Sequence, residues 1–376
     1  MNTLQPAHIR LWWHTIDRWL LFPLLAIIGL GIWLVFAASP AVAVRINLEK
    51  FHFLTRHVII LIPTLLVLFV LSMQSVRTIR VLSFLGFIGA LGLTIATLFV
   101  GIETKGAMRW LQFPGFSIQP SEFLKPLFAV VIAWVFAKQQ EMPRFPSQPL
   151  AVGIFAVCLL TLTQQPDMGM SILLTASFFG QYMLAGLPWI FIFLCAGIGI
   201  LGLLFAYMLL PHFASRIDRF LNPETGDTYQ VQKSSEAFAN GGWLGTGPGE
   251  GTVKMQVPDA HTDFVFAVAG EELGLITCSL IVLLFAAIVL RGFQRAAQQK
   301  DMFVLLAVGG IMMQFGFQTL INLGSTLHLI PTKGMTLPFV SYGGSSLVAL
   351  AIGMGIVLAL TRQHMPMTRH SPRGRL

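Results

Sequence analysis

The sequence predicts an all-α polytopic integral membrane protein with about ten transmembrane helices. Apolar residues make up 55% of the 376 residues and charged residues only 11%, whereas charged residues form roughly a quarter of a soluble domain. Apolar runs of about 20 residues recur along the chain, and each is long enough to cross a bilayer as a helix. Because backbone in lipid must satisfy its own hydrogen bonds, we expect these runs to be helical.

The first apolar run marks the start of the membrane domain. Residues 1–19 combine arginine with tryptophan, which is typical of a segment at the membrane interface. The run at 20–38 is longer than the apolar part of a usual signal peptide, so we expect an uncleaved first span. The other predicted spans lie at 54–72, 81–100, 120–137, 149–165, 168–185, 187–211, 264–290, 302–329 and 338–361.

The distribution of basic residues predicts the orientation of these spans. With the N-terminus inside, the cytoplasmic segments hold 13 Lys and Arg residues and the short outer loops hold 6, as the positive-inside rule requires. We therefore expect 1–376 to form a single transmembrane domain, with 1–19 and the tail 362–376 in the cytoplasm. Residues 212–263 form a long external loop between helices 7 and 8. The net charge of +8 does not indicate nucleic acid, because the basic residues are scattered over short loops.

The end of this external loop contains the strongest candidate for chemistry. Asp263 stands where the polar loop meets the next apolar run, with Asp259 and His261 just before it. Ionisable groups at the boundary between water and hydrocarbon are costly to keep there and are functional candidates by default. An equally ordinary alternative is that Thr262 or Asp263 caps the helix that follows.

A second candidate region precedes the span at 120–137. Its glycine, proline and aromatic residues indicate a re-entrant or interfacial loop rather than a plain connector. Glu122 and Lys125 lie three residues apart, so they are neighbours on the helix surface and face either each other or a wet cavity. The alternatives are an ion pair that only keeps the bundle in register, and interfacial anchoring by Arg109 and Trp110.

The remaining candidates lie in two further loops. The glycine-rich stretch 241–251 lacks both a preceding strand and the Gly-Lys-Ser/Thr of a phosphate-binding loop, so we assign its glycines to close backbone approach or to loop movement. Lys333 is suited to neutralise a phosphate as a point charge, and Arg216 is a second candidate cation. Ser341 and Ser345 offer hydroxyls for a ligand, or for hydrogen bonds between helices.

Eight polar segments match the motifs of a known family: 106–110, 119–122 with Lys125, 165–167, 227–230, 241–245, 258–264, 271–272 and 338–346. Together they resemble the SEDS (shape, elongation, division and sporulation) polymerases over about residues 20–361. The pieces at 227–230 and 329–334 are similar to the cell-division branch of that family rather than to its elongation branch. One departure is Met168-Gly169-Met170, where family members more often carry Leu-Gly-Thr.

The resemblance implies a peptidoglycan glycosyltransferase that polymerises lipid II into glycan strands at the division septum, on the outer face of the bacterial inner membrane. It also implies a complex with a class B penicillin-binding protein, the septal transpeptidase, and with other divisome proteins. The family's essential aspartate falls on Asp263. No cofactor is certain from the sequence; a divalent cation, Mg or Mn, is compatible with the chemistry, and its ligands are unknown.

The chemistry that the resemblance implies assigns roles to the candidates. A sugar hydroxyl must displace undecaprenyl diphosphate, which requires a base at the acceptor oxygen and positive charge at the departing phosphates. We expect Asp263 to be the general base. The expected substrate-binding residues are Arg109, Trp110, Glu122, Lys125, Arg216, His261, Lys333, Ser341 and Ser345.

Two other classes of function stay open. A transporter that flips lipid II would also have many spans and intramembrane charges such as Glu122 and Lys125. A non-catalytic divisome scaffold would use the outer loops and the basic tail only to recruit the transpeptidase. Polymerisation of purified lipid II separates these possibilities.

Overall fold

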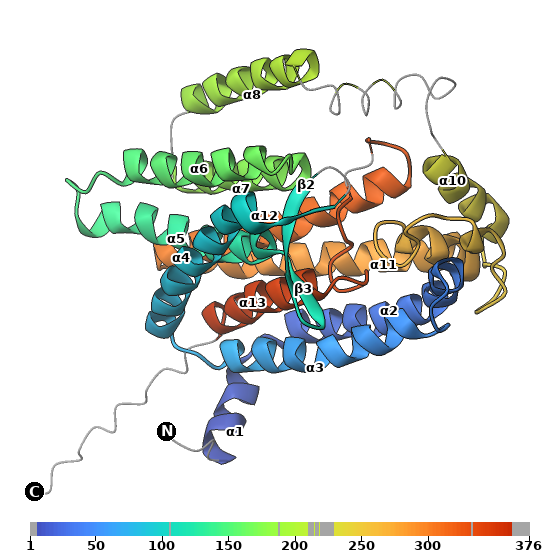
Figure 1. The fold of residues 1–376 in the computed structure, drawn as a ribbon. Helices are drawn as coiled ribbons and strands as arrows, with labels where there is room; N and C mark the ends of the chain where they lie inside the picture. The colour runs from blue at the N-terminus through green and yellow to red at the C-terminus, as the bar shows by residue number, and fades with distance from the viewer. Residues whose placement is uncertain are drawn as a thin grey trace, which may run out of the picture.

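The protein is a bundle of long helices with one small antiparallel sheet (Figure 1). The computed structural model describes residues 6–104, 107–186, 189–209, 229–331 and 334–362, together with Ala214 and Asp218. Its elements are α1 (Pro6–Thr15), α2 (Arg18–Ala43), η1 (Val44–Ile46), α3 (His52–Ser72), α4 (Val76–Val100), β1 (Ile102–Thr104), β2 (Ala107–Phe113), β3 (Phe116–Ile118), α5 (Pro120–Glu141), α6 (Ser147–Gln164), α7 (Met168–Leu184), α8 (Trp189–Leu209), α10 (Tyr229–Gly241), η2 (Val253–Met255), α11 (Val265–Ala297), α12 (Met302–Thr326) and α13 (Gly344–Leu360).

The predicted multi-pass helical architecture is confirmed. In the described part of the chain, seven helices are long and apolar enough to cross a membrane, namely α2, α3, α4, α5, α6, α11 and α12. Helices α7 and α13 and the end of α8 are shorter apolar helices. In chain order these helices correspond to the predicted spans.

Short polar side chains set several helix starts. Asp17, Ser75, Asp167 and Asp301 each precede a helix and accept a hydrogen bond from a backbone N–H of its first turn. These bonds satisfy N–H groups that have no partner within the helix. They also mark where the chain leaves the loops and enters the apolar runs.

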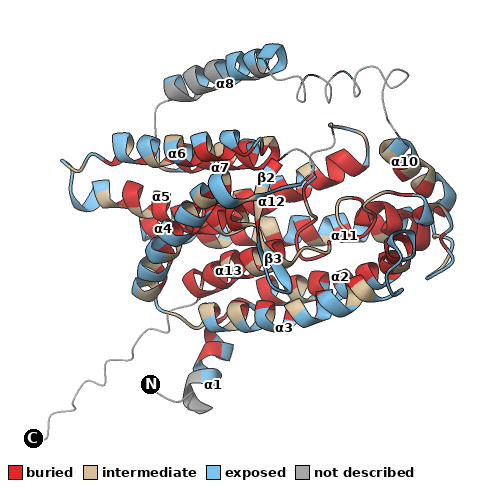
Figure 2. Cartoon of the chain, in the orientation of Figure 1, coloured by how far each residue is buried: buried red, intermediate tan, exposed pale blue. Residues whose placement is uncertain are grey.

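The core of the bundle lies around α5, α12 and α13 (Figure 2). Helices α5 and α12 are the most thoroughly buried of the long spans, whereas α3, α4 and α6 turn large apolar side chains outward. Helix α8 lies apart from the other helices in Figure 1. An apolar outer surface of this kind matches a lipid environment, where backbone groups are paired inside helices and apolar side chains face hydrocarbon.

The loop before α5 contains the sheet, which the sequence analysis did not predict. β2 pairs antiparallel with β1, placing Trp110 opposite Ile102, and with β3, placing Leu111 opposite Ile118. Gly115 makes the second turn at a φ of 87°, a conformation that glycine adopts without steric cost. The two hairpins satisfy the backbone of a segment whose composition alone indicated an irregular loop.

The last span begins later than predicted. α13 starts at Gly344, because the residues before it form turns rather than helix. Leu337, Phe339 and Val340 in these turns are buried, so their apolar character reflects burial among helices and not a helical span. The approach is close: a Cβ on Gly31 of α2 would lie 2.2 Å from the Phe339 carbonyl oxygen.

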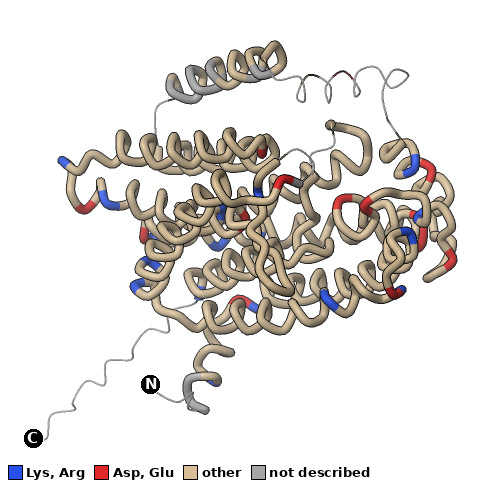
Figure 3. Tube along the Cα trace, in the orientation of Figure 1, with Lys and Arg blue, Asp and Glu red and all other residues tan. Residues whose placement is uncertain are grey.

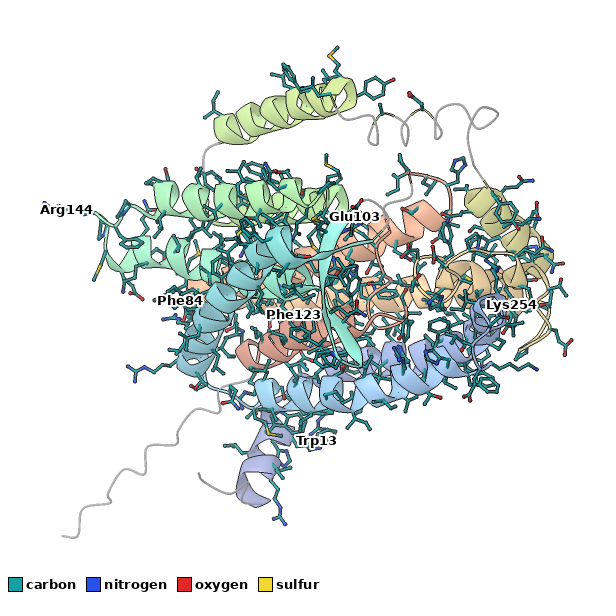
Figure 4. All side chains as sticks on the ribbon, in the orientation of Figure 1. Trp13, Phe84, Glu103, Phe123, Arg144 and Lys254 are labelled. Carbon is teal, nitrogen blue, oxygen red and sulfur yellow. The ribbon has the colours of Figure 1, made fainter. Side chains whose placement is uncertain are left out.

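Charged residues gather mainly at the two ends of the bundle, with a smaller group beside β2 (Figure 3). Arg144 and Lys254 mark the opposite ends in Figure 4. Just before α2, buried Asp17 accepts hydrogen bonds from Arg291, at 2.9 Å, and from Arg295 near the end of α11. Burial raises the pKa of Asp17, but the bonds and charges of these two arginines outweigh it, so that the pKa lies below its usual value.

Candidate active site

A cavity of about 860 Å³ lies beside β2, where several helices and loops meet. Its wall combines the start of α3, strand β2, the starts of α5 and α7, the end of α12 and the turns before α13. A volume of this size accommodates a ligand the size of a sugar diphosphate. The charged and polar residues of its wall include Arg56, Arg109, Trp110, Gln119, Glu122, Asp167, Asp259, Asp263, Gln318, Asn322, His328, Tyr342, Ser345 and Ser346.

Three successive backbone carbonyls hold the segment that carries Asp263. The His261 carbonyl accepts from the Tyr342 N–H at 2.9 Å, and the Thr262 carbonyl accepts from the Ser341 hydroxyl at 2.5 Å. The Asp263 carbonyl accepts from the Asn322 side-chain amide at 2.9 Å. Segments far apart in sequence therefore determine the backbone position of Asp263.

Asp263 does not occupy the N-cap position of α11. α11 begins at Val265, and its N-cap residue is Phe264, whose side chain makes no capping hydrogen bond. The Thr262 hydroxyl instead donates to the Asp259 carbonyl at 3.2 Å. Asp263 lines the cavity, and a Cβ on Gly334 would lie 3.6 Å from its Oδ2 atom. The capping alternative left open by the sequence is thus wrong, and the carboxylate faces the cavity beside Gly334.

Arg109 and Trp110 reach the cavity from β2. A guanidinium nitrogen of Arg109 lies 3.3 Å from a carboxylate oxygen of Asp167 at the start of α7. The Gln119 side-chain amide approaches the same oxygen at 3.5 Å. Arg109 therefore brings a positive charge to the wall with one acidic partner already in place.

Lys125 is not among the residues that line the cavity. Its ammonium group is buried and lies 2.8 Å both from Glu122 and from the Gln318 side-chain oxygen. Glu122 lies at the cavity wall. The predicted pair of opposite charges is therefore present, and Lys125 acts on the cavity through Glu122 and Gln318 rather than from its surface.

Three amides follow one face of α12 at intervals of four residues, and we call them the amide row. Gln314 donates to the Lys125 carbonyl at 2.9 Å. Gln318 accepts from Lys125 and donates to the Thr336 carbonyl at 3.0 Å. Asn322 donates to the carbonyls of Asp263 and Met335 at 2.9 and 2.6 Å. The row joins α5, the start of α11 and the turns before α13 around the cavity.

The other predicted site residues occupy different places. Ser345 lines the cavity, and its hydroxyl accepts from the Gln119 N–H at 2.9 Å. Ser341 is buried, and its hydroxyl also accepts from the Leu337 N–H at 2.8 Å, so it holds backbone. His261 is buried against Phe53, with 4.1 Å between the ring centroids. Arg216 and Lys333 lie outside the described residues.

Several wall residues were missed by the sequence analysis. Arg56 was only one of the six basic residues counted in the short outer loops, yet it lines the cavity and forms a side-chain hydrogen bond with Tyr342. Burial raises the pKa of the Tyr342 hydroxyl, although Arg56 opposes that shift. Gln318 and Asn322 did have a signal, because amides spaced four apart in an apolar run share one helix face and are costly in hydrocarbon.

The cavity wall contains carboxylates, which are the usual protein ligands of a divalent cation. Within the described residues, no group of three or more His, Cys, Asp or Glu side chains could hold a metal ion. Mg²⁺ typically binds one or two carboxylates together with substrate phosphates and water. Asp263 and Asp259 are suited to that mode, in which a bound divalent cation would neutralise phosphate charge.

The fold and the cavity define a class: a multi-pass membrane protein whose helices and loops enclose a cavity lined by acidic residues and arginines. The family model for FtsW, RodA and SpoVE, described as cell cycle protein, matches residues 18–365. The chain belongs to this family, and the SEDS resemblance of its loops is confirmed.

Relatives and solved structures support the assignment. The chain is 42% identical over 354 residues to the probable peptidoglycan glycosyltransferase FtsW of Caulobacter vibrioides, covering 94% of this chain and 91% of the relative. It is 36% identical over 357 residues to that of Geobacter metallireducens, covering 91% and 94%.

Among solved structures, a chain of a peptidoglycan synthase complex that coordinates polymerization and crosslinking matches with a TM-score of 0.75 and 28% identity, over 92% of this chain and 97% of that one. The rod shape determining protein RodA of Thermus thermophilus matches with a TM-score of 0.69 and 26% identity, over 93% and 97%.

Proposed function

We propose that this protein is a peptidoglycan glycosyltransferase that polymerises lipid II during septal wall synthesis, with Asp263 as general base. The enzyme class rests on the family and on relatives of that name that match over more than nine tenths of the chain. The substrate and the role of Asp263 rest on the chemistry of the cavity.

One observation carries the proposal. Asp263 lines the cavity, and its segment is held at the backbone from α12 and from the turns before α13. A catalytic carboxylate needs this combination, because the group must be fixed in position and still reach the substrate.

The reaction balances with the groups at hand. The acceptor hydroxyl oxygen forms a bond to the anomeric carbon of the donor sugar, and the bond from that carbon to the diphosphate oxygen breaks. Asp263 takes the hydroxyl proton, and undecaprenyl diphosphate leaves with the bonding electron pair. Arg109 and Arg56 in the wall stabilise the negative charge that develops on the leaving group.

The proposal extends to the setting of the enzyme. The partner is a class B penicillin-binding protein within the divisome, and a chain of a peptidoglycan synthase complex with the same fold supports such pairing. Both termini lie in the cytoplasm, because most basic residues lie on that side. The cavity then opens on the outer side of the inner membrane at the septum, where lipid II would meet it.

Polymerisation of purified lipid II tests the proposal. Wild type, Asp263→Asn and the control Glu250→Gln are purified with the transpeptidase partner and assayed for glycan strands. Glu250 is an exposed acid of the external loop outside the cavity wall. We expect polymer from wild type and from the control, and none from Asp263→Asn, with equal partner binding by all three.

Two results would overturn parts of the proposal. Polymer from Asp263→Asn at the wild-type rate removes Asp263 as the base. If neither wild type nor any variant makes polymer, and wild type and Asp263→Asn move lipid II across liposome membranes equally fast, the protein is a transporter instead.

A further inference from the structure

Helix α11 is broken near its start, and a loop fills the break. Gly274 has φ 75° and ψ 178°, which are not helical. A break of this kind frees backbone groups that membrane surroundings cannot satisfy. Four hydrogen bonds with the 242–247 loop pair these backbone groups. Before the break, the Glu271 and Glu272 carbonyls accept from the N–H groups of Thr246 and Gly247 at 2.9 and 3.1 Å. After it, the N–H groups of Leu275 and Ile276 donate to the Gly242 and Trp243 carbonyls at 2.9 and 3.2 Å.

The loop is held closely against the helix. A Cβ on Gly245 would lie 2.2 Å from the Glu272 carbonyl oxygen, and one on Gly274 would lie 2.3 Å from the Gly245 nitrogen. Close by, the buried Glu271 carboxylate accepts from the N–H groups of residues 252–254, each at 2.7 Å. The backbone of this loop is therefore fixed, and it presents its side chains in one arrangement.

Two large apolar side chains point outward from this fixed loop. Trp243 is 71% exposed and Leu244 is 80% exposed. We call this pair the Trp243–Leu244 tip. The backbone around the tip is hydrogen-bonded to Leu275 and Ile276 of α11. The side chains of these two residues are about half exposed, and with exposed Leu283 they form an outward apolar face of the helix. In a membrane helix such an apolar face contacts lipid, so the tip extends a lipid-facing surface.

The length of α11 places the tip along the membrane normal. Near its other end, at Ala297, α11 carries Arg291, which pairs with Asp17 just before α2, on the side where we expect the cytoplasm. At 1.5 Å per residue, the stretch from Gly274 to Arg291 is about 26 Å long, close to the roughly 30 Å thickness of hydrocarbon. The break therefore lies near the membrane boundary on the Asp263 side, which is where tryptophan is enriched.

We infer that the Trp243–Leu244 tip inserts into the bilayer interface on the Asp263 side and anchors the external loop to lipid. The bound partner is the membrane itself, at the level where headgroups meet acyl chains. Because Glu271 ties residues 252–254 to the same helix break, the anchor also restrains the chain that leads to Asp263. This inference does not rest on the proposed function, and its test requires no catalytic activity.

Nitroxide labels measure the depth of the tip. The full-length protein, with its three cysteines replaced by alanine, carries one label at Leu244→Cys, Glu250→Cys or Leu283→Cys. Each variant is reconstituted alone into nanodiscs of phosphatidylethanolamine and phosphatidylglycerol. Collision of the label with oxygen and with a water-soluble nickel chelate is then measured. Glu250 is the exposed loop control, and Leu283 is the control on the outward face of α11.

We expect the nickel accessibility at Leu244 to be several-fold lower than at Glu250 and close to that at Leu283, with oxygen accessibility raised. Equal nickel accessibility at Leu244 and Glu250 would overturn the inference. Protection of Leu244 only after the transpeptidase partner is added would also overturn it, because the tip would then be a protein-docking surface. A folded state is verified for every variant by gel filtration.

Discussion

The side-chain amide of Asn322 donates a hydrogen bond to the backbone carbonyl of Asp263 at 2.9 Å, across a sequence separation of 59 residues. The same amide group donates to the Met335 carbonyl at 2.6 Å. One buried side chain of α12 therefore fixes both the segment that carries the candidate base and the turns that pass in front of it. The geometry of the cavity depends on contacts of this kind.

Asn322→Ala should lower polymerisation while leaving the affinity for lipid II nearly unchanged. Removing the amide frees two carbonyls and lets Asp263 shift, and a displacement of about 1 Å can cost roughly a hundredfold in rate. We therefore expect a fall of about 10- to 100-fold in kcat with little change in KM. The measurement is the rate of glycan formation against lipid II concentration.

Thr319→Val is the matched control for this change. Thr319 is buried one turn earlier on α12, and its hydroxyl donates to the Phe315 carbonyl of its own helix. The control should keep most of the activity. Equal losses from both variants, with lowered folded yield, would mean that Asn322 only stabilises the bundle.

Lys125→Met should destabilise the protein more than the double variant Glu122→Gln with Lys125→Met. The single change leaves Glu122 without its cation at the edge of the core, and breaking a buried ion pair costs about 3 kcal/mol or more. The double variant removes both charges together. Thermal unfolding in detergent measures the difference, and activity per folded molecule is recorded in parallel.

A different pattern would change the role of Lys125. If both variants are as stable as wild type and both lose lipid II binding, Lys125 contacts the substrate despite its burial. The Lys138–Glu141 pair, with the same spacing but exposed at the other end of α5, serves as the control. Its removal should change the unfolding temperature much less than Lys125→Met does, because water and salt screen an exposed pair.

Asp17 should make the protein sensitive to acid. Burial raises the pKa of Asp17, but Arg295 and Arg291 together outweigh it, so the folded-state pKa lies below the usual value of 3.8. The stabilisation is therefore fully present above pH 3.8 and is lost as the pH falls toward the lower folded-state pKa. Asp17→Asn should be less stable than wild type at neutral pH and should lose less stability between pH 5 and pH 3, roughly the range in which the unfolded carboxyl titrates.

Unfolding in detergent over this pH range tests the Asp17 prediction. The two curves should converge as the pH falls. Parallel curves for wild type and Asp17→Asn would show that the carboxylate contributes nothing that depends on its charge.

Gly274→Ala should disturb the break in α11. Its φ of 75° is strained for any residue with a Cβ, at a cost of about 1–3 kcal/mol, and the new Cβ would meet the 242–247 loop. Gly89→Ala in α4 is the control, because no atom lies within 4 Å of its added Cβ. That control should be neutral or stabilising by about 0.5–1 kcal/mol.

Proteolysis of the external loop reports the Gly274 effect. We expect faster cleavage in Gly274→Ala than in wild type or in Gly89→Ala, because the 242–247 loop loses its hydrogen bonds to α11. Unchanged cleavage together with unchanged thermal stability would refute the account of the break.

The spans were predictable because lipid selects for apolar length and composition, which are local properties of the chain. Asp263 was predictable for a related reason, since a carboxylate at the end of a polar loop is costly beside an apolar run. The amide row was not predicted, although its spacing was visible. Its hydrogen-bond partners, such as Lys125 for Gln318, lie up to 193 residues away in the sequence. A local sequence pattern cannot predict which distant residues these partners are.

The sequence by itself determined that the chain crosses the membrane many times, which apolar runs contain its long helices, and which carboxylate ends the polar loop before one of those runs. Only the tertiary structure decided that Asp263 lines a cavity and is not the N-cap residue of α11. It also decided that Lys125 and Ser341 hold the wall rather than form it, and that α13 begins at Gly344. The physical reason is that composition controls burial in lipid, whereas a hydrogen bond between distant segments exists only once packing has brought its two partners together.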